Sequence, residues 1–214
     1  MLLSPQGLLT PRRRWPMLVP LTDYRYALVQ TLGGDITFTR ASTGTYTNNA
    51  GLVTSAGNNI ARFAYDNTGR ALGVLLEGSA TNLILQSESQ STVPWANVWG
   101  GGVTLIENDA IAPDDTLTAD KLVQIDAITD GNSQQIGLTA LATYTFSGYF
   151  KNSNASLSSI NMYDAVNSSI SASLQFAWTA GVPSTSTSPG ATKIIYDSIG
   201  SSWYRISFGF TTLA

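Results

Sequence analysis

Acidic side chains are the residues of this chain best suited to chemistry, because the sequence has no histidine and no cysteine. Their absence excludes imidazole bases, thiol nucleophiles, disulfides and His or Cys metal sites. A glycosidase would need two carboxylates about 5–10 Å apart across one bond. Asp114 and Asp115 are instead adjacent between Pro113 and Thr116, which is typical of a turn. We therefore predict no catalytic residue and no cofactor: the protein is not an enzyme.

The same acidic region has a second interpretation as a calcium site. Five carboxylates lie within 14 residues of one another: Glu107, Asp109, Asp114, Asp115 and Asp120. Oxygen atoms are the ligands that Ca²⁺ prefers, but the spacing does not match an EF-hand loop. We favour ordinary solvated loops, with calcium as the alternative, and assign no metal ligand.

Aromatic side chains offer a surface on which sugar rings can stack. The candidates are Trp95, Trp99, Trp178, Trp203, Tyr149, Tyr163, Tyr196 and Tyr204. In a β-sandwich such residues more often fill the core. Trp99 precedes Gly100–Gly102, a segment poorly suited to a packed strand, so we expect Trp99 to be exposed and to be the first candidate for contact with a glycan. Neighbours on a strand point to opposite faces, so at most one of Trp203 and Tyr204 should belong to the core.

The composition indicates a folded β protein. Of 214 residues, 43% are hydrophobic and only 12% are charged, which is enough apolar surface for a sizeable core. The polar residues are mainly Ser, Thr, Asn and Gly, types that favour strands and turns. Residues 1–94 carry seven basic and five acidic side chains, whereas residues 95–214 carry four and nine. This acidic second part argues against a nucleic-acid partner. The sequence has no run of 18 apolar residues, so we expect no helix that spans a membrane.

The first 34 residues are predicted to form an extended arm. The basic cluster lies between Pro11 and Pro16, and proline disfavours a helix there. A secretory signal would place its charge before its apolar stretch, whereas Leu2–Leu9 precede the arginines, so we expect no signal peptide. The many apolar residues favour attachment to an acidic surface of another protein over a solvated tail. The predicted attachment residues are Leu8, Leu9, Arg12, Arg13, Arg14 and Trp15.

Short apolar runs separated by turn residues predict the fold. Before Pro94 we expect a strand at residues 35–38, a hairpin from 42–47 to 52–53, and a strand pair at 62–65 and 72–76. Residues 80–87 fit either a helical turn or an extended connector. After Pro94 we expect strands at residues 103–106, 121–125, 133–138, 144–151, 159–163, 171–178, 194–197 and 203–210. Pro183–Gly190 predicts a long loop. The fold class is therefore all-β, with a small β-rich connector domain at 35–94 and a jelly-roll β-sandwich at 95–214.

Two ordered series of motifs cover residues 35–210. The first is Phe38–Thr43, Arg62–Asp66 and Leu75–Leu83; the second is Trp95, Ala112–Leu122, Tyr144–Ser147 and Trp203–Ser207. The first series resembles tailed-bacteriophage virion structural proteins, described as head spikes or fibres and as tail appendages. The second resembles the carbohydrate-binding-module type of jelly roll that follows it there. The resemblance implies a place on the virion surface, capsid or tail proteins as partners, and a homotrimer.

The resemblance also bears on the end of the chain and on three charged residues. Relatives usually continue beyond the strand at 203–210, so we expect a neighbouring subunit to complete the last strand pair, or an open edge. Arg40, Arg62 and Glu77 belong to the first series and lie in apolar segments. A buried charge needs a partner, so we predict a structural ion pair between Glu77 and Arg40 or Arg62. Recognition of an outside ligand by these three residues is the alternative.

The sequence therefore favours a non-enzymatic component of the phage surface: a head fibre, a capsid decoration protein or a tail appendage. It would attach through its N-terminal region and display the jelly roll. The main alternative is a tail adhesin that binds host-surface glycans. A polysaccharide depolymerase would instead require carboxylates with perturbed pKa values in one cleft.

Overall fold

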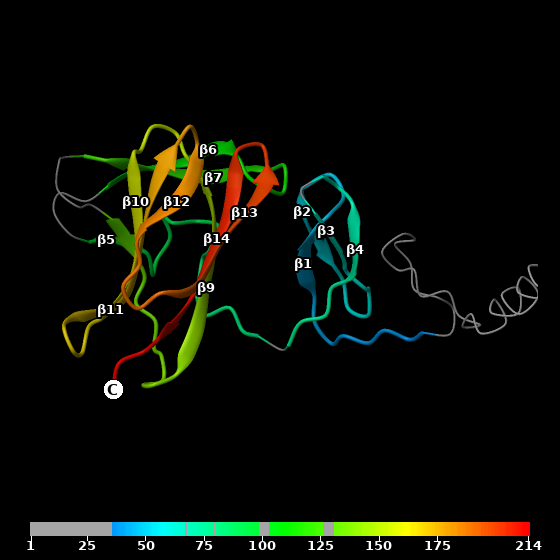
Figure 1. Cartoon of the computed structure of the whole chain (residues 1–214), viewed down its shortest axis with the longest axis horizontal. Helices are drawn as coiled ribbons and strands as arrows, with labels where there is room; N and C mark the ends of the chain where they lie inside the picture. The colour runs from blue at the N-terminus through cyan, green and yellow to red at the C-terminus, as the bar shows by residue number, and fades with distance from the viewer. Residues whose placement is uncertain (1–35, 67, 79, 99–102, 126–130) are drawn as a thin grey trace, which may run out of the picture.

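The computed structural model describes residues 36–66, 68–78, 80–98, 103–125 and 131–214. Within these ranges the protein is all-β and its sheets are antiparallel, as the sequence predicted (Figure 1). The described part of the chain holds no helix long and apolar enough to cross a membrane. The predicted arm at residues 1–34, with Leu8, Leu9, Arg12, Arg13, Arg14 and Trp15, lies outside the described residues, as does Trp99.

A small N-terminal β unit consists of two hairpins. Strands β1 (Gly44–Thr47) and β2 (Val53–Ala56) form the first, and β3 (Phe63–Tyr65) and β4 (Ala71–Val74) form the second. The first turn is closed by Asn48, whose Oδ1 accepts hydrogen bonds from the N–H groups of Ala50 and Leu52. Asp66 closes the second turn in the same way, accepting from Thr68 and Arg70. Both hairpins were predicted from these Asn, Asp and Gly residues.

The strand predicted at residues 35–38 is wrong, since residues 36–40 form no strand. A strand needs a partner ladder, and the N–H of Arg40 donates instead to the side chain of Asn59, at 3.0 Å. Residues 80–87 contain no helical turn and belong to an irregular connector that joins the small unit to the remainder of the chain.

Two sheets of three strands pack face to face to form the sandwich. One has the order β10 (Leu157–Asp164), β11 (Ser169–Thr179) and β12 (Val182–Thr187); the other has the order β13 (Thr192–Gly200), β14 (Trp203–Thr211) and β9 (Thr143–Lys151). The core lies between their central strands and contains Ala172, Leu174, Phe176, Ile206, Phe208 and Phe210. Burial of one such Phe or Leu side chain contributes about 1.5–3 kcal/mol.

Four further strands extend this sandwich. A hairpin joins β6 (Val103–Ile111) to β7 (Leu117–Gln124), and β5 (Ala96–Val98) pairs with β8 (Gly131–Ser133). The strand predicted at 133–138 therefore ends at its first residue. Beyond it, the side-chain amide of Gln134 accepts from the N–H of Leu85 and donates to its carbonyl, at 2.7 and 2.6 Å. This segment binds the connector through a side chain instead of a ladder.

One prediction near the end of the chain is also corrected. Pro183–Gly190 is not a long loop, because its first part belongs to β12, which pairs with β11. Its threonines are β-branched, a type that suits a pleated strand when a partner is present. The final strand β14 lies between β9 and β13, and within this sheet the last strand pair leaves an edge at β13, which is one of the two outcomes expected for it.

Candidate functional site

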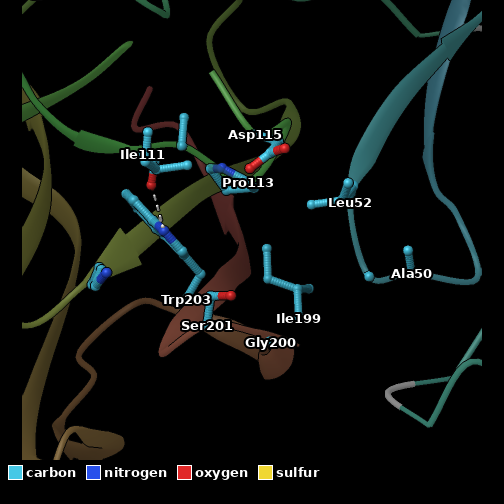
Figure 2. A pocket seen from close by; sticks show the side chains of 12 residues that line it. Ala50, Leu52, Ile111, Pro113, Asp115, Ile199, Gly200, Ser201 and Trp203 are labelled. Atoms are coloured by element: carbon cyan, nitrogen blue, oxygen red, sulfur yellow. Dashed lines mark hydrogen bonds between the residues drawn. The ribbon is translucent and has the colours of Figure 1, made fainter. Parts of the chain in front are cut away.

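The small β unit meets the sandwich along a seam that includes a cavity of about 150 Å³. Figure 2 shows Leu52 of the β1–β2 turn facing Pro113 of the β6–β7 turn across this space. The N–H of Val53 donates to the carbonyl of Pro113 at 2.8 Å, so the two turns are joined by backbone. Gly51 adopts φ +79°, and a Cβ there would lie 3.0 Å from the carbonyl oxygen of Ile199. Both the positive φ and the close approach of Ile199 therefore favour glycine at this position.

Trp203 forms one wall of the seam. It is buried, with 8% of its surface exposed, and its Nε1 donates to the carbonyl of Ile111 at 3.0 Å (Figure 2). Lys151 Nζ lies 6.0 Å from the centroid of the indole ring, at the limit of a cation–π contact. The next residue, Tyr204, points to the other face of the strand and packs edge to face on Trp178 beside the core. Tyr204 is thus the one of the two aromatics that packs on the sandwich core, while Trp203 lies on the opposite face, bonded to β6 and lining the seam.

A second groove of about 240 Å³ lies between the same two units. Its walls come from the small unit and from the outer face of the sheet that contains β9 and β14. The lining residues are Thr45, Tyr46, Thr47, Arg62, Ala64, Tyr65, Leu75, Glu77, Tyr149 and Arg205. This groove brings together two guanidinium groups, a carboxylate and three phenols, so we take it as the candidate binding site.

On the small-unit wall, the structure places Arg62 and Glu77 in an ion pair. Arg62 Nη2 lies 2.7 Å from Glu77 Oε2, and Nη1 donates to the carbonyl of Thr45 at 2.8 Å. The side chain of Arg62 is 11% exposed and that of Glu77 is 51% exposed, so the carboxylate lies partly in solvent. The pair therefore fixes Arg62 against β1, and its contribution to stability is limited by solvent screening.

Arg40, the other arginine predicted as a possible partner of Glu77, binds backbone oxygens. Its guanidinium donates to the carbonyls of Ser42, Ala56 and Gly57, at 2.7, 2.9 and 2.7 Å. Arg40 is therefore bound to backbone oxygens, and among the described residues the carboxylate of Glu77 pairs with Arg62 and not with Arg40. One buried nitrogen of each arginine, Arg40 Nη1 and Arg62 Nε, has no hydrogen-bond partner.

On the sandwich wall, Arg205 and Tyr149 lie side by side. They are opposite each other in the register of β14 and β9, on the face that points away from the core. Arg205 Nε donates to Ser147 Oγ at 2.8 Å. Burial raises the pKa of Tyr149, and the positive charge of Arg205 acts in the opposite direction. Across the groove, burial and then the nearby Tyr46 raise the pKa of Tyr65. Both phenols are therefore neutral hydrogen-bond donors.

Two of the carboxylates considered for catalysis or calcium, Asp114 and Asp120, accept hydrogen bonds from nearby backbone and side chains. Asp114 Oδ1 accepts from the hydroxyl and the N–H of Thr116, at 2.6 and 3.1 Å, and the hydroxyl bond holds the pKa of this carboxyl below its ordinary value. Asp120 accepts from the N–H groups of Gln90 and Asn108. Within the described ranges no three acidic residues come together as metal ligands.

Sequence reasoning did not identify Tyr149 and Arg205 as members of one site. Tyr149 was among the aromatic residues considered for stacking on a sugar ring, and Arg205 belongs to the Trp203–Ser207 motif, but neither signal indicated what would face them. No model of a known protein family matches this chain, and no characterised protein is similar to it in sequence. The function must therefore be argued from the residues themselves.

Proposed function

We propose that this protein is a non-enzymatic structural component of the surface of a bacteriophage particle. It attaches through its N-terminal region and displays the β-sandwich, as a head fibre, a decoration protein or a tail appendage. The two ordered motif series support this assignment, and so does the arrangement of a small β unit joined to a sandwich. The observation that carries it is a set of large aliphatic side chains left exposed where another subunit or virion protein would cover them.

The β6–β7 hairpin has the clearest concentration of these side chains. Leu122 lies opposite Leu105 on one face, and Val123, its neighbour on the strand, points to the other face; both Leu122 and Val123 are exposed. Near the turn, Ile111 lies opposite Leu117, which is 58% exposed. An isolated two-stranded hairpin is at best marginally stable in water and needs packing partners. Apolar groups on both faces of such a hairpin are what a subunit of a larger assembly would present.

The connector shows the same feature. Leu76, Leu85 and Val93 are all exposed, Val93 to 82%, although this segment has no ladder of its own to order it. Aliphatic groups on an irregular segment gain free energy when a neighbouring molecule covers them. Contacts with other virion proteins, and self-association as a homotrimer, would provide that cover.

The carboxylates support a role without catalysis. A general acid needs a raised pKa near the working pH. The pKa values of Asp66, Asp114 and Asp164 are instead lowered, in each case mainly by a hydrogen bond from a nearby side chain: Thr68, Thr116 and Asn167 respectively. These groups are fixed as anions within turns, which is a structural use.

The proposal is tested by locating the protein on purified particles. Mass spectrometry and immunogold electron microscopy should find it on intact virions; many copies on the head would indicate a decoration protein or fibre, and a position at the tail tip would favour the adhesin. Absence from the particles would overturn the proposal.

A second test uses light scattering on the isolated chain. The double variant Leu117→Ser, Leu122→Ser should lower the oligomeric mass or the occupancy on particles. Val166→Ser, which changes an exposed residue between β10 and β11, is the matched control and should change neither. Equal behaviour of the two variants would contradict the role of the hairpin.

A further inference from the structure

The polar groove contains two arginines whose hydrogen bonding differs. On one wall, Arg62 is occupied, because its Nη atoms bind Thr45 and Glu77. On the other wall, Arg205 is held at Nε by Ser147, and the described residues make no hydrogen bond or ion pair with its two Nη atoms. Fixing a guanidinium at Nε orients its plane and leaves the Nη pair as a fork for a planar anion. Arg205 is therefore prepared for a partner that this chain does not provide.

The charges of the groove favour an anion. Two guanidinium groups line it against one carboxylate, Glu77, which lies 2.7 Å from Arg62. A further acid, Asp197, lies opposite Arg205 in the register of β13 and β14, and its charge also raises the pKa of Tyr149, but Asp197 and Arg205 do not form an ion pair within 4.0 Å. A carboxylate on a ligand would meet a positive charge that is only partly compensated.

The remaining lining groups suit the hydroxyl groups and ring of a sugar. Tyr46 and Tyr65 come from the small unit, and Tyr149, which is 39% exposed, comes from the sandwich. Phenols combine an apolar ring face with a donor and acceptor at its tip, and Thr45 and Thr47 add lining positions with hydroxyl side chains. A volume of about 240 Å³ is below that of a typical drug-sized pocket, so it admits about one sugar residue.

We propose that this groove binds a single carboxylate-bearing sugar residue, such as a uronic acid, with the carboxylate on the Nη fork of Arg205 and the ring against Tyr149. The site spans both units, so the seam at Trp203 and Gly51 positions its two walls. It is argued from residues other than Trp99, where a glycan contact was predicted, and it does not depend on where the protein is located on a particle.

Titration calorimetry on the full chain with D-glucuronate, D-glucose, acetate and inorganic phosphate tests the proposal. Glucuronate should bind saturably, and glucose and acetate at least about tenfold more weakly, since each lacks one half of the recognised chemistry. Phosphate bound as tightly as glucuronate would indicate a general anion site and overturn the sugar assignment. No saturable binding of glucuronate up to about 10 mM would overturn the proposal as a whole.

Variants identify the residue responsible. Arg205→Met should weaken glucuronate binding at least about tenfold, the loss expected for a charge-assisted hydrogen-bonded pair. Lys193→Met removes the same charge from the neighbouring strand β13, outside the groove, and should change the affinity less than about twofold. Equal effects of the two variants would leave only long-range electrostatics and refute the site.

A measurement on the unaltered protein covers the case in which Arg205→Met does not fold. Glucuronate should shift the amide resonances of residues that line the groove, Tyr46, Arg62, Tyr149 and Arg205, and leave those of β10 and β12 unchanged. Shifts confined to other parts of the chain would place the ligand elsewhere and refute the proposal.

Discussion

The substitution Gly190→Ala tests whether the segment that follows β12 packs on β11. Gly190 follows β12, adopts φ +72° and forms a parallel bridge with Ser173 of β11. A Cβ at this position would lie 2.3 Å from the carbonyl oxygen of Ser171 and 3.1 Å from Cα of Ala172. Alanine therefore forces the backbone of β11 to move next to core residues. Gly181, in the β11–β12 turn, has φ +80° and no heavy atom within 4 Å of its Cβ position, so it is the matched control.

The two substitutions share one cost and differ in another. Alanine at a left-handed φ costs about 1–2 kcal/mol at either site. Only Gly190→Ala adds a steric conflict with packed backbone, and overpacking costs about 1–3 kcal/mol more. We therefore expect the free energy of unfolding to fall by about 1–2 kcal/mol for Gly181→Ala and by about 2–5 kcal/mol for Gly190→Ala.

Urea unfolding followed by tryptophan fluorescence measures this difference, because Trp178 lies on β11 beside the core and Trp203 lies on β14. The midpoints should shift without a change in the denaturant slope, which would show that stability and not compactness has changed. Equal losses for the two variants, or a smaller loss for Gly190→Ala, would mean that the segment after β12 does not pack on β11 as described. The original prediction of a long loop would then be favoured.

Three further outcomes follow from the same structure. Glu77→Gln should lower the free energy of unfolding in urea by less than about 1 kcal/mol, because the Glu77 side chain is half-exposed. Arg62→Met should lower it by about 2–3 kcal/mol, because this variant also leaves the carbonyl of Thr45 without its charged donor. A larger loss for Glu77→Gln than for Arg62→Met would contradict this geometry. Phe208→Ala removes a fully buried ring between the sheets and should cost about 3–5 kcal/mol, and a loss below about 1 kcal/mol in calorimetry would place Phe208 outside the core. Hydrogen bonds from Thr68 and Arg70 hold the pKa of Asp66 below its ordinary value of 3.8. The ionised carboxylate therefore stabilises the fold above pH 3.8, and this contribution is lost as the pH falls through the lowered pKa. Asp66→Asn should therefore lower the melting temperature at about pH 6, and this loss should shrink as the pH falls below 3.8; an effect that grows in acid would refute the sign.

Sequence reasoning succeeded where the determinants are local. The alternation of Tyr144, Phe146 and Phe150 with polar neighbours is a property of consecutive residues, and it predicted a half-buried strand that the structure contains. Turn residues such as Asn48 and Asp66 bind their own backbone a few residues away, so both hairpins could be located without knowing the rest of the molecule. The lack of histidine and cysteine limited the available chemistry before any fold was known.

Tertiary structure decided everything that depends on which distant segment becomes a neighbour. The Ser- and Thr-rich stretch at 182–187 is a strand because β11 offers it an edge, and its own composition could not distinguish that outcome from a loop. The groove exists because packing sets Arg62, which directly precedes β3, against Arg205 of β14, and no spacing along the chain encodes that approach. Propensity acts between near neighbours, whereas a binding site needs long-range contacts whose free energy is gained only when both units are folded and joined.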